Sequence, residues 1–161
     1  AEKAVNAEID RLLNIKGKRS VDSIHKELGH IMWEYVGMGR TAEGLKEGLK
    51  KMHELEKEFD TNLFVPGKKE GLNVELDKAI HLRDFFTMGE LVAFDALSRN
   101  ESCGGHFREE YQTEEGEAKR DDENYFYVGC WEYKGKGNEP ELIKEPLEYE
   151  AIKVQTRNYK N

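Results

Sequence analysis

The residues best suited to chemistry lie in the segment Cys103-Gly-Gly-His106. A cysteine near a histidine can form a nucleophile pair or supply half of a metal site. The second half of such a site is missing, because Cys130 is the only other cysteine and lies far along the chain. A small Cys/His enzyme is therefore one hypothesis for this sequence.

The alternative for the same segment is structural. Gly104 and Gly105 can form a tight turn, because glycine adopts positive φ at little cost. No strand is expected before them and no G-x-G-x-x-G pattern follows, so they do not form a dinucleotide-binding loop. The polar residues around the turn would then hold it by hydrogen bonds: Glu101, Ser102, His106 and Arg108.

Two further polar motifs have both a functional and a structural interpretation. His25 and His30 are five residues apart, about 140° around a helix, whereas the zinc-protease motif needs four. They are interpreted as ordinary helix residues. The segment Arg120-Asp-Asp-Glu-Asn124 could bind a cation or a basic partner. Alternatively it is an ion-paired loop in which Asp122 or Asn124 caps the backbone.

Composition excludes several classes of protein. The chain has 161 residues, with 25 basic and 33 acidic side chains and a net charge of −8. This acidic balance argues against nucleic-acid binding. No run of 18 apolar residues could span a membrane, and two cysteines suit a reducing compartment. The sequence starts without methionine or a signal-peptide pattern, and we expect it to be a piece of a longer polypeptide.

Hydrophobic periodicity predicts the elements that must position these residues. Apolar residues recur every three or four positions in the first hundred residues, and proline is absent before Pro66. Ser20, Thr41 and Asn73 are suitable N-caps, and Gly17 is expected to end the first helix as a C-cap. The predicted helices cover residues 1–15, 20–36, 41–60 and 73–99.

The longest predicted helix is apolar on more than one side, so it is either central or buries a face against something outside this chain. We expect an apolar patch along residues 76–97. Residues 101–124 are polar and glycine-rich. Residues 125–133 are typical of a strand, a turn is expected at Gly135 and Gly137, and residues 141–153 could return as a second strand.

These elements predict an all-α fold. It is an up-and-down, spectrin-repeat-like bundle of three helices, with a short leading helix and an irregular, partly β-hairpin C-terminal tail. Residues 1–100 form the bundle, and residues 101–161 form a loop and tail that pack on it as one domain. Physical reasoning alone leads to a helical interaction module without an active site of its own, which could also be free-standing.

The motif Ser98-Arg-Asn-Glu-Ser-Cys-Gly-Gly-His-Phe-Arg108 resembles the C-terminal helical domain of the succinate dehydrogenase and fumarate reductase flavoprotein subunit. The segments Ile9–Gly17 and His30–Met38 are also similar to this family. Its pattern Arg/Lys-x-Glu-Ser-Arg-Gly-Ala-His-x-Arg is followed by Arg-Asp-Asp-x-Asn. The matching positions here are Glu101, Ser102, Gly104, His106, Arg108, Arg120, Asp121, Asp122 and Asn124.

Two positions depart from the family pattern. Cys103 stands where the family usually has arginine, and Gly105 where it usually has alanine. An ion pair between that arginine and a neighbouring domain is therefore in doubt here. L-aspartate oxidase is similar over the same region and is the nearest alternative, although the tyrosine-rich tail favours the dehydrogenase and reductase side.

The resemblance implies a role in an oxidoreductase of electron transport and the tricarboxylic acid cycle. The parent would interconvert succinate and fumarate through FAD, whereas this chain would hold no catalytic, cofactor-binding or metal-binding residue. The implied partners are the flavin-binding and capping domains of the same polypeptide, the iron–sulfur subunit and, indirectly, a membrane anchor. The implied location is cytoplasmic, peripheral on the inner face of the membrane. The motif residues, Cys103 and Gly105 included, are interdomain candidates.

Overall fold

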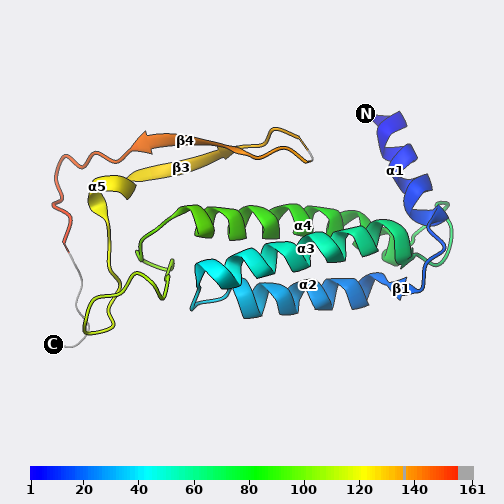
Figure 1. Ribbon diagram of the computed structural model, residues 1–161. Helices are drawn as coiled ribbons and strands as arrows, with labels where there is room; N and C mark the ends of the chain where they lie inside the picture. The colour runs from blue at the N-terminus through cyan, green and yellow to red at the C-terminus, as the bar shows by residue number, and fades with distance from the viewer. Residues whose placement is uncertain (136, 156–161) are drawn as a thin grey trace. The chain divides into compact units, whose positions relative to one another are not determined.

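A computed structural model describes residues 1–135 and 137–155 (Figure 1). The chain divides into two compact units, which are considered separately. The first contains residues 1–99 together with Arg108–Glu110. The second contains residues 100–107 and the chain after Glu110. The predicted packing of the tail on the bundle stays a prediction, and its last residues, 156–161, lie outside the described part of the chain.

The first unit is the predicted helical bundle. Three helices lie side by side and alternate in direction (Figure 1). The side chains of Ser20, Thr41 and Asn73 each accept a hydrogen bond from a backbone N–H in the first turn of the helix that follows, as predicted. The three helices are α2 (Val21–Val36), α3 (Ala42–Asn62) and α4 (Val74–Ser98).

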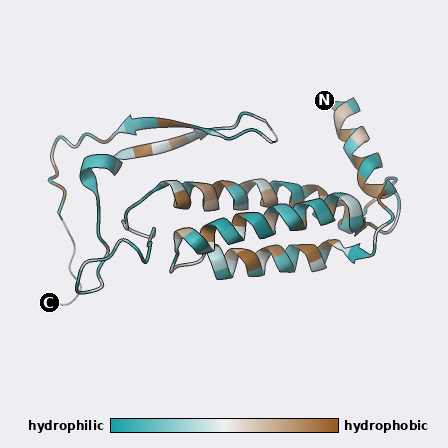
Figure 2. Cartoon of the chain, viewed as in Figure 1, coloured by the Kyte–Doolittle hydropathy of each residue, from teal (hydrophilic) through white to brown (hydrophobic). Residues whose placement is uncertain are grey.

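The core of the bundle lies where the apolar stripes of these helices meet. α3 is hydrophilic over most of its surface, whereas α2 and α4 carry more hydrophobic residues (Figure 2). The all-α bundle with a hairpin tail is thus confirmed. The most completely buried apolar side chains include Leu12, Ile24, Leu45, Met52, Phe59, Leu63, Leu82 and Ala93.

The chain crosses itself tightly at Gly17, which corrects the prediction of a C-cap there. Helix α1 (Glu2–Asn14) ends with Ile15 as its C-cap. The Gly17 N–H instead donates to the Leu63 carbonyl oxygen at 3.0 Å. A Cβ at Gly17 would lie 1.9 Å from the backbone carbon and oxygen of Asn62. This glycine is therefore needed because two backbones touch, not because a helix ends.

A short parallel sheet continues this crossing. Strand β1 (Arg19–Ser20) pairs with β2 (Leu63–Phe64) in the register Arg19↔Leu63. It joins the start of α2 to the end of α3. The buried Leu63 anchors this end of the bundle in the core.

The second unit is mostly irregular. It contains the short helix α5 (Asp122–Tyr125) and the antiparallel strands β3 (Tyr127–Glu132) and β4 (Glu141–Pro146). Gly135 and Gly137 both have positive φ in the connection, as the predicted turn requires. The return strand ends at Pro146 rather than near Lys153, because proline has no N–H to continue the ladder.

A glycine at the contact of α2 with α3 gives a stability prediction. A Cβ at Gly48 would lie 2.7 Å from the Tyr35 Cβ, which cannot swing away. We expect Gly48→Ala to lower the free energy of unfolding by about 1 kcal/mol, since the clash outweighs the better helix propensity of alanine.

The matched control for this prediction is Gly89→Ala. A Cβ there meets the sulfur atoms of Met32 and Met52 at 3.1 and 3.3 Å, and flexible methionine side chains can move aside. Urea unfolding monitored by circular dichroism should show destabilisation for Gly48→Ala only. Equal destabilisation by both variants would contradict the assignment of a tight contact at Gly48.

Candidate functional site

The Cys103–His106 segment forms the tight turn that its glycines indicate. The Cys103 N–H donates to the His106 carbonyl oxygen at 2.8 Å, and the His106 N–H donates back at 3.0 Å. Gly104 has a φ of +60°, which a residue with a Cβ rarely adopts. Gly104 is therefore explained by backbone geometry, whereas Gly105 has no positive φ.

The turn still places the Cys103 and His106 side chains on one face, because residues directly opposite in an antiparallel pair share a face. The pKa of Arg120, in the second motif, is raised chiefly by its hydrogen bond to Asp122. Over residues 1–135 and 137–155, no three His, Cys, Asp or Glu side chains are grouped to hold a metal ion. Cys/His chemistry at this turn stays a hypothesis.

The structure brings the two predicted motifs together within the second unit. The buried Glu101 carboxylate accepts from the Asp121 N–H at 2.8 Å. The N–H of the buried Ser102 donates to the Lys119 carbonyl oxygen at 2.9 Å. Two segments that are separate in sequence thus form one hydrogen-bonded knot.

The remaining motif residues build the second half of this knot. The Arg120 Nε donates to Asp122 Oδ1 at 3.0 Å, and the Asp121 carboxylate accepts from the Asn124 N–H at 3.2 Å. The N-cap of α5 is therefore Asp121, whereas the sequence interpretation offered Asp122 or Asn124 as the cap. This correction reflects chain direction: the cap precedes the helix, and both other residues lie inside it.

Arg108 lies apart from the other motif residues, in the helical unit. Its side chain is only 2% exposed. The guanidinium donates to the carbonyl oxygens of Ala96 at 3.0 Å and Leu97 at 3.3 Å. These carbonyls belong to the last turn of α4, where helix carbonyls lack partners and the helix dipole favours a cation. Arg108 therefore caps the C-terminus of the longest helix.

Glu110 adds further contacts around the helix cap formed by Arg108, and its role was not foreseen from the sequence. Its carboxylate accepts from Arg108 Nε at 3.1 Å and from the Ala42 N–H, the first of α3. The Glu109 N–H donates to the Arg40 carbonyl oxygen at 2.8 Å. The segment Arg108–Glu110 thus ties the end of α4 to the start of α3. No local sequence pattern predicts this connection, because the segment contacts α4 and α3 residues that lie far from it in the sequence.

The charge of Glu110 gives a pH prediction. Burial raises its pKa, but the hydrogen bonds from Ala42 and Arg108 outweigh burial and hold it below the ordinary value. A carboxylate with a lowered folded pKa stabilises the fold above its unfolded pKa, and this contribution is lost as pH falls through the folded pKa. We expect Glu110→Gln to lower the free energy of unfolding by about 1 kcal/mol at pH 7, and by progressively less as the pH falls.

Urea unfolding of wild type and Glu110→Gln between pH 7 and pH 3 tests this expectation. The difference between the two free energies of unfolding should shrink toward low pH. Glu114→Gln, at an exposed position in the next loop, should leave the profile unchanged. A Glu110→Gln difference that is independent of pH would show that the charge contributes nothing.

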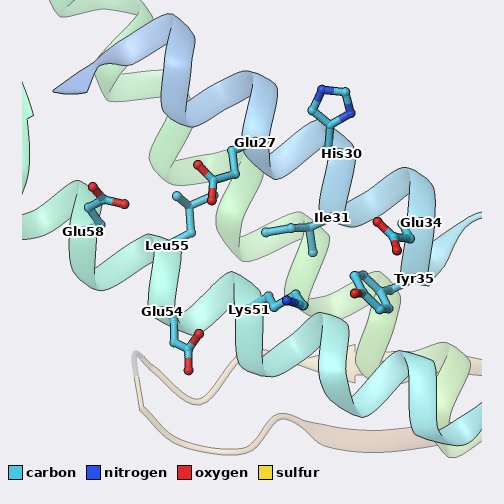
Figure 3. Close-up of a pocket in the computed structure, with 9 residues that line it drawn as sticks. All are labelled: Glu27, His30, Ile31, Glu34, Tyr35, Lys51, Glu54, Leu55 and Glu58. Carbon is cyan, nitrogen blue, oxygen red and sulfur yellow. The ribbon is translucent and has the colours of Figure 1, made fainter.

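A groove of about 370 Å³ between α2 and α3 was also not foreseen (Figure 3). Arg19 pairs with Glu27 and with Glu58 at 2.8 Å. Glu34 and Glu54 also line the groove and outnumber its one lysine, Lys51, so the groove has an acidic character that would repel a phosphate group. His30, interpreted from spacing as an ordinary helix residue, lies at its edge. The lining residues are Glu27, His30, Ile31, Glu34, Tyr35, Lys51, Glu54, Leu55 and Glu58.

A sequence model of the family described as the fumarate reductase flavoprotein C-terminal region matches residues 25–159. The chain belongs to this family. The match includes most of α2, all of α3 and α4, the Cys103–His106 turn and the Arg120–Asn124 segment. The resemblance inferred from the sequence motifs is thereby confirmed, and the family is one of flavoprotein oxidoreductases.

Individual relatives agree with this assignment. An uncharacterized FAD-dependent oxidoreductase of Methanocaldococcus jannaschii is 33% identical over 69% of this chain and 20% of its own length. The fumarate reductase flavoprotein subunit of Proteus vulgaris is 29% identical over 91% of this chain and 23% of its own length. L-aspartate oxidase 2-a of Nicotiana tabacum is 42% identical over 61% of this chain and 15% of its own length.

Solved structures share the fold. A quinol fumarate reductase of E. coli matches 96% of this chain and 26% of its own, with a TM-score of 0.80 and 24% identity. The Mycobacterium smegmatis Sdh1 complex matches 92% of this chain and 25% of its own, with a TM-score of 0.72 and 25% identity. The chain therefore spans only about a quarter of these proteins.

Proposed function

We propose that this chain is the C-terminal scaffold and docking domain of a fumarate reductase/succinate dehydrogenase flavoprotein. The observation that carries the proposal is the family match over residues 25–159. The whole enzyme interconverts succinate and fumarate through FAD, and the chain itself is not catalytic. The motif residues at 101–108 and 120–124 serve as hydrogen-bonded structure near an interdomain surface rather than as a reaction centre.

An exposed apolar surface supports a docking role. The patch expected along residues 76–97 is present on α4, where Phe85, Met88 and Val92 are 48%, 56% and 42% exposed. Apolar side chains that are exposed on a helix in this way are typical of a surface that another folded domain covers.

FAD belongs to the parent polypeptide rather than to this chain. A flavin dinucleotide needs backbone N–H groups or cations for its pyrophosphate. The groove between α2 and α3 is lined by four glutamates and one lysine, Lys51, which supports placing FAD in the parent polypeptide rather than in this groove. No step of the redox chemistry is assigned to these residues.

The proposed partners follow from the same assignment. They are the flavin-binding and capping domains of the same polypeptide, the iron–sulfur subunit and, through these, a membrane anchor. Among the described residues, no helix is long and apolar enough to cross a bilayer. The proposed location is the inner face of the membrane, reached through the complex, and nucleic acid is not a partner.

A second candidate is the C-terminal domain of an enzyme of the L-aspartate oxidase type. The tobacco enzyme has the higher identity, 42%, but matches only 61% of the chain. The Proteus fumarate reductase subunit matches 91%, which must include most of the hairpin tail. The longer match favours the reductase and dehydrogenase side.

An antibody raised against this chain distinguishes these possibilities. Host extract is separated on a denaturing gel, viewed for flavin fluorescence and then blotted. A large fluorescent band supports a covalent flavoprotein of the proposed kind. A large band without fluorescence favours the aspartate oxidase type. A band near 18.6 kDa, the mass of this chain alone, would overturn both assignments in favour of a free-standing helical protein.

A further inference from the structure

Helix α1 is attached to the bundle through its last two turns. Residues 1–7 are exposed, whereas Leu12 is completely buried in the core and Ile9 and Leu13 pack against it. The helix contacts α4 and β2, and its first turn points away from the three bundle helices (Figure 1). Segments with few buried apolar contacts open at a lower free energy than the core, so we expect α1 to open before the other helices of this unit.

Four alternating charges connect these two turns to α3 and α4. Within α1, Arg11 Nε lies 2.8 Å from Glu8 Oε2. Arg11 Nη1 lies 3.3 Å from Asp60 Oδ1 on α3, and Arg83 on α4 pairs with the same Asp60 carboxylate. Arg83 Nη2 also lies 3.9 Å from Glu8 Oε1, so each of the four charges has two opposite charges as neighbours. We call Glu8, Arg11, Asp60 and Arg83 the charge ring.

Arg83 belongs to the bundle rather than to α1. Its guanidinium carbon lies 5.0 Å from the centre of the Phe59 ring, and its Nη1 donates to Glu56 Oε1 at 3.0 Å. These contacts hold the side chain in place whether or not α1 is docked. Arg83 also offsets the repulsion between Glu8 and Asp60, because without it these two carboxylates share a single arginine.

The charge ring is open to solvent, unlike the chain crossing that follows α1. Its four side chains are between 25% and 41% exposed, and salt weakens ion pairs of this exposure. A further exposed pair, Asp10 with Lys69 at 2.9 Å, also attaches α1. Beyond Ile15, by contrast, the Gly17 N–H is bonded to the carbonyl oxygen of the completely buried Leu63. Salt should therefore loosen α1 while the crossing keeps its place.

We propose that α1 is a hinged helix held against the bundle by the charge ring. When the ring opens, α1 leaves the bundle as a unit, its extended C-cap Ile15 is the hinge, and the bundle stays folded from Gly17 onward. The ionic strength then sets the fraction of molecules in which α1 is docked, which gives the chain a conformational response to salt. This inference goes beyond the proposed function and applies to either candidate enzyme.

Hydrogen exchange of the full-length polypeptide tests the salt response without any substitution. A detached helix of 13 residues is only marginally stable in water, so its amides exchange once α1 leaves the bundle. Raising sodium chloride from about 0.05 to about 0.5 M should speed exchange of residues 2–14 about fivefold and leave residues 45–59 of α3 unchanged. Exchange of residues 2–14 that does not respond to salt would overturn the proposal.

Arg83→Met tests the charge ring itself. Methionine keeps an unbranched stem over Phe59 but carries no charge. At low salt we expect residues 2–14 to exchange about tenfold faster than in wild type, and most of the salt dependence should disappear. If residues 45–59 exchange faster by the same factor, α1 does not open separately from the bundle and the hinge is refuted.

Lys78→Met is the matched control, because Lys78 lies on the same helix and also pairs with carboxylates. Its Nζ lies 3.0 Å from Asp22 on α2 and 2.9 Å from Glu75 on α4, and neither residue belongs to α1. The substitution should leave exchange of residues 2–14 at the wild-type rate. An equal increase in Lys78→Met and Arg83→Met would show that loss of any positive charge on α4 releases α1, and the charge ring would have no special role.

Discussion

Arg108→Ala is expected to lower the free energy of unfolding by about 3 kcal/mol, the largest effect of any motif residue. The guanidinium is 2% exposed and reaches two carbonyl oxygens at the end of α4 as well as Glu110. Its removal leaves the Ala96 carbonyl without a donor in a buried site, and it removes the partly buried bonds to the Leu97 carbonyl and to Glu110. Each unsatisfied buried group costs about 1–3 kcal/mol, so the losses accumulate.

Arg120→Ala is the matched control for this expectation. Arg120 also pairs with a carboxylate, that of Asp122, but its side chain is 24% exposed and water can replace it. We expect its loss to cost less than about 1 kcal/mol. Thermal and urea unfolding of both variants give the comparison. A cost for Arg108→Ala no greater than for Arg120→Ala would show that the helix cap contributes little.

The helices were predictable because their signals are local. Apolar spacing, the absence of proline and the caps Ser20, Thr41 and Asn73 act within one or two turns. The glycine turn at Gly104 was predictable for the same reason. The hairpin was predictable as a tendency, but its end at Pro146 depends on which residues pair across it.

The long-range contacts of the candidate site were not predictable. Nothing near Glu110 indicates that its carboxylate meets the first N–H of α3, 68 residues earlier. The pairing of Glu101 with the backbone of Asp121 likewise spans 20 residues. The family resemblance placed Glu101 and Arg108 in one motif, but only the structure separates the helix cap at Arg108 from the knot at Glu101.

Gly17 was correctly singled out from the sequence, but the structural role predicted for it was wrong. Its place after an apolar stripe is typical of a C-cap, yet the helix ends at Asn14 and Gly17 lies against the backbone of Asn62. We expect Gly17→Ala to lower the free energy of unfolding by about 3 kcal/mol, because a methyl group 1.9 Å from backbone atoms forces two chain segments apart. That separation also breaks the hydrogen bond from Lys18 N–H to the Asn62 carbonyl oxygen, 2.9 Å long.

Gly105→Ala separates this effect from the general consequence of replacing a glycine. A Cβ at Gly105 meets nothing within 4 Å, and its φ is not positive. The substitution should therefore be neutral or stabilising by about 0.5 kcal/mol, through reduced entropy of the unfolded chain. In urea unfolding at pH 7, Gly17→Ala should be less stable than wild type, whereas Gly105→Ala should be as stable as wild type or slightly more stable. Stability of Gly17→Ala equal to wild type would mean that the α1 end and the α3 end do not touch, and the crossing that anchors β1 to β2 would have to be abandoned.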